Sequence, residues 1–228
     1  TFLLAVLASG LAAPAAAQRL FAPDQASGGL VELDPVDGSV VSLVAVDLPS
    51  LTGGASMLPV AGTQLPNGEI WISDLSANAV FRLDRSATTY LGAIPVVLDQ
   101  PRQLVPYSGG VLLANGGFDG GAPGPGRIHL DAQGQIVAFF ATTQPFGLLP
   151  FELAGVDGYL YTEFGFRAVT FADASNLALQ TMFAPVGGAA FTLFPEDLAQ
   201  RANGNVRVAS FISPSGIYEL DPSGQVVQ

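Results

Sequence analysis

Short apolar runs separated by turn-forming residues follow one another along most of the chain. One pattern, an apolar run that closes on Leu-Asp, recurs at residues 30–34, 80–84, 128–131 and 217–221, with a weaker copy at 169–172. The copies lie 41 to 50 residues apart. Short runs bounded by turn residues predict β-strands, and a fixed spacing of this size predicts a structural repeat.

Each copy has further strand-like runs on both sides. A run that opens at Gly precedes it, a third run follows it, and a run led by Pro comes before the Gly. The Gly-led runs are Gly68–Ile72, Gly110–Leu113, Gly158–Tyr161 and Gly204–Val208, and the leading prolines are Pro59, Pro101, Pro150 and Pro195. Four strands in about 40 to 50 residues are typical of a propeller blade. The sequence therefore predicts an all-β fold, a β-propeller of four-stranded blades.

The two ends of the chain predict a signal segment and an incomplete ring. The first repeat begins at residues 19–21 with its second strand, and the chain stops at Gln228 inside the fourth strand of repeat five. We expect about four and a half to five blades, a fragment truncated at its C-terminus. Residues 1–17 predict a signal peptide without its n-region, because small residues follow the apolar stretch Phe2–Leu11. Residues 18–228 form the expected propeller domain, exported to the periplasm or outside the cell; a buried N-terminal helix or strand is the alternative reading of residues 1–17.

Composition narrows the class of partner. The chain is 49% hydrophobic and 12% charged, has a net charge of -11, and contains no Cys and one His. Its eight basic residues are all Arg and are scattered singly, so we expect no binding to nucleic acid, which needs clustered cations. The apolar N-terminal stretch is too short to cross a membrane. The remaining partners are a protein, a glycan or a small molecule, and we expect a monomer.

Several conspicuous polar residues have structural interpretations. Asp34, Asp131 and Asp221 stand where tight hairpins begin, and Asp there bonds its own backbone, so we predict that these carboxylates form turns. His129 alternates with Ile128 and Leu130 and is expected to be a half-exposed strand residue. The Gly- and Pro-rich segment 115–126 predicts a long blade loop.

Two sets of equivalent positions in the repeats contain the candidate metal ligands. The positions two residues after each leading Pro are Ala61, Gln103, Glu152 and Asp197. The positions six beyond Gly68, Gly109, Gly158 and Gly204 are Asp74, Asn115, Phe164 and Ser210. Ligands of propellers bind where loops and inner strands of several blades converge. Glu152, Asn115 and Asp197 offer the oxygen ligands that a hard cation such as Ca²⁺ prefers, which makes Ca²⁺ the candidate cofactor. The competing interpretation is that they are solvated loop residues.

The segment Pro66–Asp84, PNGEIWISDLSANAVFRLD, resembles a blade of the NHL-repeat and related six- or seven-bladed propellers. Gluconolactonase-like enzymes and virginiamycin B lyase share this blade style. The resemblance extends over about residues 19–228 and implies the fold. The set Glu152, Asn115 and Asp197 is similar to the Glu, Asn and Asp metal ligands of gluconolactonase-like enzymes in residue type only.

Two functions from different classes follow. The first is an exported propeller without catalytic activity that binds a protein, glycan or small ligand at its channel face. The second is a metal-dependent lactonase or esterase of gluconolactonase type, in which Glu152, Asn115 and Asp197 hold the ion and one carboxylate activates water. The sequence identifies no catalytic residues.

Overall fold

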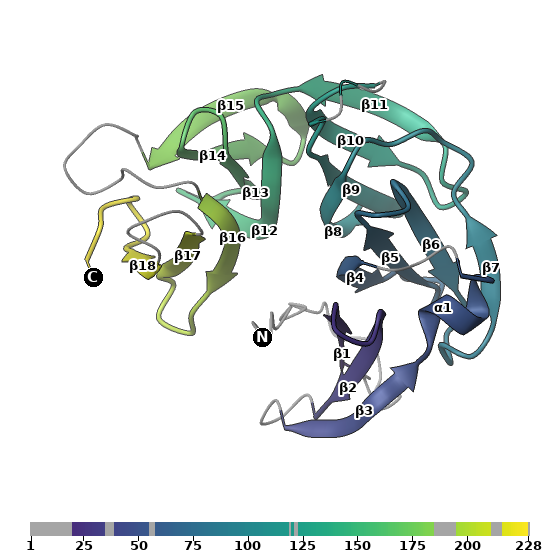
Figure 1. The fold of residues 1–228 in the computed structure, drawn as a ribbon. Helices are drawn as coiled ribbons and strands as arrows, with labels where there is room; N and C mark the ends of the chain where they lie inside the picture. Colours follow the sequence, from purple (N-terminus) through teal and green to yellow (C-terminus); the bar gives the residue numbers. More distant parts are fainter. Residues whose placement is uncertain are drawn as a thin grey trace.

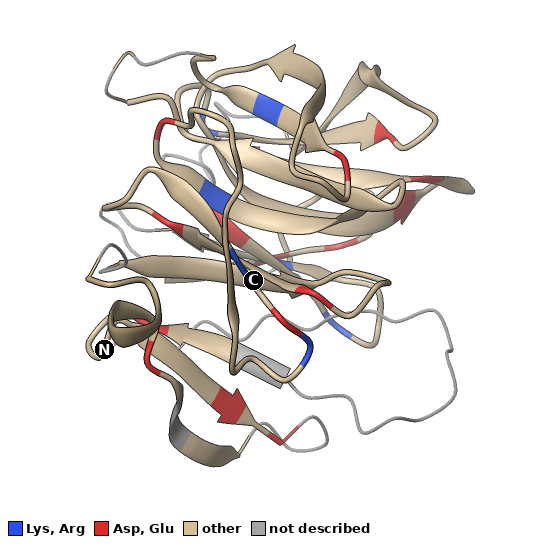
Figure 2. Ribbon diagram, turned by 90° about the vertical axis from the view of Figure 1, so that its right-hand side faces the viewer, with Lys and Arg blue, Asp and Glu red and all other residues tan. Residues whose placement is uncertain are grey.

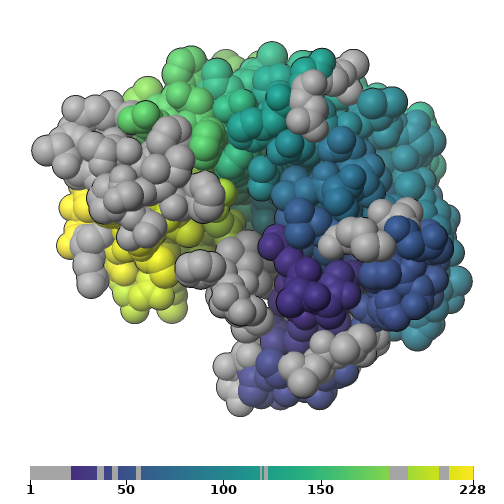
Figure 3. All heavy atoms as spheres, viewed as in Figure 1, coloured from purple at the N-terminus to yellow at the C-terminus, as the bar shows by residue number. Residues whose placement is uncertain are grey.

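The computed structural model describes residues 20–34, 39–54, 58–118, 120, 123–184, 195–210 and 216–227. These residues form eighteen strands and one short helix, α1 (Leu48–Leu51). Figure 1 shows the strands as five antiparallel sheets set in an arc around a common centre, and Figure 3 shows the same view in space-filling form, with the purple first sheet and the yellow last sheet at the two ends of the arc. The prediction of an all-β propeller of about five blades is confirmed.

Each blade is one antiparallel sheet. Blade 1 holds β1 (Leu20–Asp24), β2 (Gly29–Leu33) and β3 (Val40–Val46); blade 2 holds β4 (Pro59–Gln64), β5 (Ile70–Asp74), β6 (Ala79–Leu83) and β7 (Tyr90–Ala93). Blade 3 holds β8 (Pro101–Tyr107), β9 (Gly110–Asn115), β10 (Gly126–Leu130) and β11 (Ile136–Ala141). Blade 4 holds β12 (Pro145–Leu153), β13 (Val156–Glu163), β14 (Ala168–Asp173) and β15 (Asn176–Ala184); blade 5 holds β16 (Pro195–Gln200), β17 (Val206–Ser210) and β18 (Gly216–Leu220).

The inner strands β4, β8, β12 and β16 contact one another in turn and surround the centre of the arc, which we call the channel. The second strand of each blade contacts the inner strand of the next, as β5 contacts β8. In the described part of blade 1, β1 contacts β4 in the same way. Because β1 pairs with β2, which ends at Leu33 as β6 ends at Leu83, the first described strand of blade 1 holds the second-strand position that the repeat predicted.

The core consists of apolar clusters between neighbouring blades. The equivalent residues of the repeat, Leu33, Leu83, Leu130, Phe171 and Leu220, are all buried. The cluster between blades 2 and 3 centres on the fully buried Trp71, Leu113 and Ile128, and the cluster between blades 4 and 5 contains Leu160, Val208 and Leu220. The recurring Leu is thus conserved along the chain because each blade must bury one face against its neighbour.

The acidic turns form as predicted where the structure describes them. Asp131 Oδ1 accepts hydrogen bonds from the backbone N–H groups of Gln133 and Gln135, both at 2.9 Å. Asp221 Oδ1 makes the equivalent bonds to Ser223 and Gln225 at 2.9 and 3.0 Å. Residues 35–38, which follow Asp34, lie outside the described residues. Figure 2 views the ring from the side and shows acidic residues at strand ends and in the turns between them.

The expected signal segment, residues 1–17, lies outside the described residues. Among the described residues, no helix has the length and apolar character that crossing a membrane requires.

Candidate ligand site at the channel mouth

The inner strands begin at one end of the ring, which we call the channel mouth. Pro59, Pro101, Pro145 and Pro195 open these strands, and each pairs with the last residue of the second strand of its blade. Those partners are Asp74, Asn115, Glu163 and Ser210. A register irregularity follows every one of the four prolines. Such irregularities interrupt the ladder and redirect nearby side chains, and they are frequent beside functional sites.

The preceding blade holds the irregular backbone in place. Ser73 Oγ, on blade 2, donates a hydrogen bond of 2.6 Å to the carbonyl oxygen of Arg102 on blade 3. Thr162 Oγ1, on blade 4, donates to the carbonyl oxygen of Glu196 on blade 5 at 3.4 Å and accepts from the N–H of Gly147 at 2.8 Å. The backbone at Arg102 and Glu196 is therefore positioned by a hydroxyl of the neighbouring blade.

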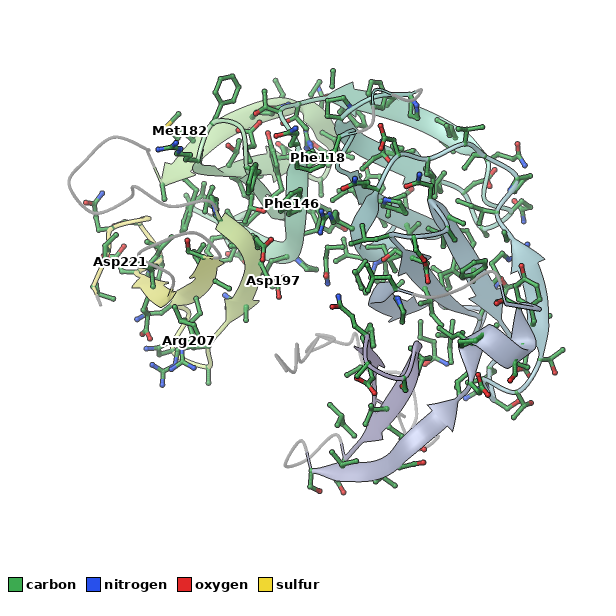
Figure 4. All side chains as sticks on the ribbon, viewed as in Figure 1. Phe118, Phe146, Met182, Asp197, Arg207 and Asp221 are labelled. Carbon is green, nitrogen blue, oxygen red and sulfur yellow. The ribbon has the colours of Figure 1, made fainter. Side chains whose placement is uncertain are left out.

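Six side chains from blades 3, 4 and 5 gather at this end of the ring, and we call them the mouth cluster: Arg102, Phe118, Phe146, Phe164, Glu196 and Asp197. Figure 4 shows Phe118 beside Phe146, and Asp197 on the channel side of β16. The ring centroids of Phe146 lie 5.5 Å from Phe118 and 4.9 Å from Phe164. Phe146 is buried, whereas Phe118 is 39% exposed, so the aromatic group reaches from the core to the surface.

Arg102 lies over this aromatic group. Its guanidinium carbon is 4.2 Å from the ring centroid of Phe146 and 5.9 Å from that of Phe118, a cation–π arrangement. Nη2 donates to Gln100 Oε1 at 3.2 Å, while the buried Nε has no hydrogen-bond partner among the described residues. Burial lowers the pKa of Arg102, and the nearby charge of Glu196 partly offsets this change.

The two carboxyl groups of the cluster are adjacent on β16. Burial raises the pKa of Glu196, and the charge of Arg102 acts in the opposite direction. Burial also raises the pKa of Asp197 from 3.8 to about 6; a backbone hydrogen bond from Leu198 opposes this rise, and the neighbouring Glu196 adds to it. The mouth thus combines one cation, two carboxyl groups of raised pKa and an aromatic surface.

The structure brings two of the three proposed metal ligands to the mouth and places the third elsewhere. Asn115 and Asp197 lie at or near the mouth ends of β9 and β16. Glu152 pairs with Asp157 beside the β12–β13 hairpin, at the opposite end of the ring. The pairing register puts Gly147, and not Glu152, two residues into the inner strand of blade 4. The two positions are five residues apart along the strand, a distance of about 16 Å.

Asn115 already has hydrogen-bond partners. Its Oδ1 accepts from the N–H of Asp99 at 2.9 Å and its Nδ2 donates to the carbonyl oxygen of Gly124 at 2.6 Å. The side chain therefore joins two loops of blade 3. Among the described residues, no three His, Cys, Asp or Glu side chains are grouped so that they could hold a metal ion. Metal binding by Glu152, Asn115 and Asp197 stays a prediction.

The sequence predicted that Asp74, Asn115, Phe164 and Ser210 occupy equivalent positions. The structure confirms three of them and moves the position in blade 4 by one residue. Asp74, Asn115 and Ser210 pair with the opening prolines, but the equivalent residue of blade 4 is Glu163 rather than Phe164. Glu163 is buried and accepts hydrogen bonds from the hydroxyls of Thr142 and Thr170. This position thus anchors loops at the mouth.

His129 is a strand residue of intermediate exposure, as predicted. Its ring meets Tyr107 edge to face at 4.7 Å, and burial lowers the pKa of its imidazole. The predicted loop 115–126 is present in its described part and contributes Phe118 to the mouth cluster.

Sequence reasoning missed Arg102, Phe146 and Glu196, although one signal was available. Each of them directly follows an opening proline of an inner strand. With Pro145 in place of Pro150 as the leading proline of blade 4, the three residues occupy equivalent positions of three blades.

No family model matches the chain, and no curated protein sequence matches it. Solved structures do match. A putative gluconolactonase shares 14% identity and a TM-score of 0.64 over 92% of this chain and 72% of that one. A gluconolactonase from Xanthomonas campestris shares 18% identity and a TM-score of 0.64 over 92% of this chain and 70% of that one.

Propellers with other roles are equally similar. A catalytically inactive virginiamycin B lyase from Staphylococcus aureus, solved with quinupristin, shares 14% identity and a TM-score of 0.62 over 92% of this chain and 66% of that one. A chain of a nidogen/laminin complex shares 13% identity and a TM-score of 0.66 over 92% of this chain and 74% of that one. At these identities the likeness shows the fold alone: the chain is a β-propeller similar to gluconolactonase-like and NHL-type propellers.

Proposed function

We propose that the chain is an exported β-propeller binding protein that takes a small molecule at the mouth cluster. The proposal rests on the burial and the missing polar partners of the Arg102 guanidinium. Its guanidinium is half-buried on Phe146, its Nε lacks a hydrogen-bond partner, and it forms no ion pair with a described residue.

A partly buried arginine without an ion pair is stabilised when a ligand brings an anion to it. Moving a charge out of water is costly unless the charge is paired and hydrogen-bonded. The packing of Phe146 and the hydroxyl of Ser73 hold the side chain and backbone of Arg102 in place without supplying an anion. A bound carboxylate at the part of the guanidinium that solvent still reaches would supply the missing counter-charge at little cost in side-chain ordering.

A panel of small organic acids, amino acids and sugars tests this proposal by ligand-observed NMR. We expect some members to bind the wild-type chain and to lose binding in Arg102→Gln. The matched control is Arg207→Gln, which removes an arginine that is 48% exposed on β17. Ligands that bind the Arg102→Gln variant as well as the wild type would overturn the assignment of the site. Binding of a glycan or protein alone, with no small ligand, would also contradict it.

The alternative proposal is a Ca²⁺-dependent lactonase or esterase at the mouth, with Asn115 and Asp197 as ligands. Glu152, the third predicted ligand, lies about 16 Å away along β12 and could not bind the same ion. Gluconolactonase structures among the similar propellers support the alternative, as does the raised pKa of Asp197, which suits a group that transfers protons. Lactone and ester turnover with Ca²⁺ and with chelator decides between the two proposals. The binding-protein proposal predicts no turnover in either condition, and Ca²⁺-dependent turnover lost in Asp197→Ala would establish the alternative.

Export and the monomeric state are part of the same proposal. The apolar stretch Phe2–Leu11 and the small residues up to Ala17 support cleavage before Gln18. The test expresses the chain with a start codon and a basic pair ahead of residue 1. We expect a periplasmic, monomeric product beginning at Gln18; retention of the uncleaved chain in the cytoplasm would contradict export.

A further inference from the structure

We propose that the ligand of the mouth cluster is a small amphoteric molecule with an apolar side chain, that is, a free α-amino acid of aromatic or branched aliphatic type. This inference rests on the proposed binding function and names its ligand class. Three separate features of the cluster match the three parts of such a molecule.

Arg102 matches the carboxylate. Guanidinium groups bind carboxylates through charge-assisted hydrogen bonds, and Arg102 keeps donor capacity for one because Gln100 occupies Nη2 alone among its described neighbours. Its contact with Phe146 fixes the plane of the guanidinium, so that little rotamer freedom is lost on binding.

Glu196 and Asp197 match the ammonium group. Neither carboxyl forms an ion pair with a described arginine, although Glu196 lies close enough to Arg102 for the two charges to affect each other. A ligand that presents an anion toward Arg102 and a cation toward β16 would satisfy both ends at once. A simple anion would meet repulsion from Glu196, and a simple cation would meet repulsion from Arg102.

The phenylalanines match the apolar side chain. Phe118, Phe146 and Phe164 have mutual centroid distances of 4.9 to 5.9 Å, and Phe118 is 39% exposed at the edge of the group. An aromatic ring added to such a group packs edge to face or offset, which stabilises it beyond the effect of the apolar area that it buries. No other part of the cluster would favour an apolar ligand.

Isothermal titration calorimetry with three matched probes tests the inference. L-phenylalanine carries both charged groups, 3-phenylpropionate carries only the carboxylate, and 2-phenylethylamine carries only the ammonium. We expect L-phenylalanine to bind at least tenfold more tightly than either of the others. We also expect Arg102→Gln and Glu196→Gln each to weaken its binding at least tenfold, and Arg207→Gln to leave it unchanged. Circular dichroism melts confirm that each variant folds.

The outcomes separate this inference from the broader proposal. If 3-phenylpropionate or 2-phenylethylamine binds as tightly as L-phenylalanine and Arg102→Gln still abolishes binding, the amphoteric ligand class is wrong while the mouth site stands. If L-phenylalanine binds equally well to the folded Arg102→Gln variant, the site itself is wrong. If none of the three probes binds, the inference is overturned, and the wider ligand panel alone decides the binding function.

Discussion

Replacing Asp197 by Asn should stabilise the folded chain at neutral pH. Burial raises the pKa of Asp197 from 3.8 to about 6, so the folded state holds this proton more tightly than the unfolded state does. The contribution to stability is complete below the unfolded pKa and is lost as the pH rises through the folded one. At about 1.4 kcal/mol for each tenfold change in proton affinity, the loss is roughly 3 kcal/mol at most.

The expected gain is smaller than this limit. The Asp197 side chain keeps some contact with solvent, which screens the effect, and we expect Asp197→Asn to be about 1–2 kcal/mol more stable than the wild type at pH 7.5. Near pH 4 the two chains should be nearly equal in stability, because the wild-type carboxyl is then protonated when folded. Urea unfolding at both pH values measures the difference.

Asp221→Asn is the matched control for this experiment. Hydrogen bonds from Ser223 and Gln225 lower the pKa of Asp221, so its carboxylate stabilises the fold above the unfolded pKa and this contribution is lost as the pH falls. The control variant should therefore be less stable than the wild type at pH 7.5. An Asp197→Asn chain that is also less stable at pH 7.5, or a difference that stays the same at pH 4, would refute the reasoning.

Three further predictions concern the mouth cluster and the ion pair of blade 2. Gly147→Ala should destabilise the chain by about 1–3 kcal/mol in urea unfolding, because a Cβ at Gly147 would lie 2.9 Å from the Asp197 Cα; an unchanged midpoint would contradict this close approach of blades 4 and 5. Glu69→Gln should cost about 0.5–1 kcal/mol, since Glu69 accepts two hydrogen bonds from Arg82, both at 2.9 Å; equal destabilisation in high salt and low salt would argue against an ion pair. The affinity for L-phenylalanine should rise between pH 5 and pH 7 as Asp197 ionises; calorimetry that shows a fall would contradict the role of this carboxyl.

The fold was predictable because its determinants repeat along the chain. Leu33, Leu83, Leu130 and Leu220 mark equivalent buried positions, and Asp131 and Asp221 mark equivalent turns. Both signals are local, since a strand buries alternate residues and a turn needs particular residues at fixed offsets. Their period was therefore enough to predict blades.

The site was less predictable because strand register decides which residues meet. Strand β12 runs from Pro145 to Leu153 and contains two prolines that precede apolar residues, so the sequence allows two alignments. Only the pairing of Pro145 with Glu163 shows that Gly147 is the inner residue and that Glu152 belongs to the far hairpin. The mouth cluster also joins side chains of three blades, and no local pattern reports such an encounter.

A crystal structure of the chain grown with L-phenylalanine tests the central claim most directly. We predict the ligand at the channel mouth, with its carboxylate on Arg102, its ammonium group toward Glu196 and Asp197, and its ring against Phe118 and Phe146. A structure in which the ligand lies elsewhere, or in which the mouth is empty at a concentration that saturates binding in solution, would contradict the account.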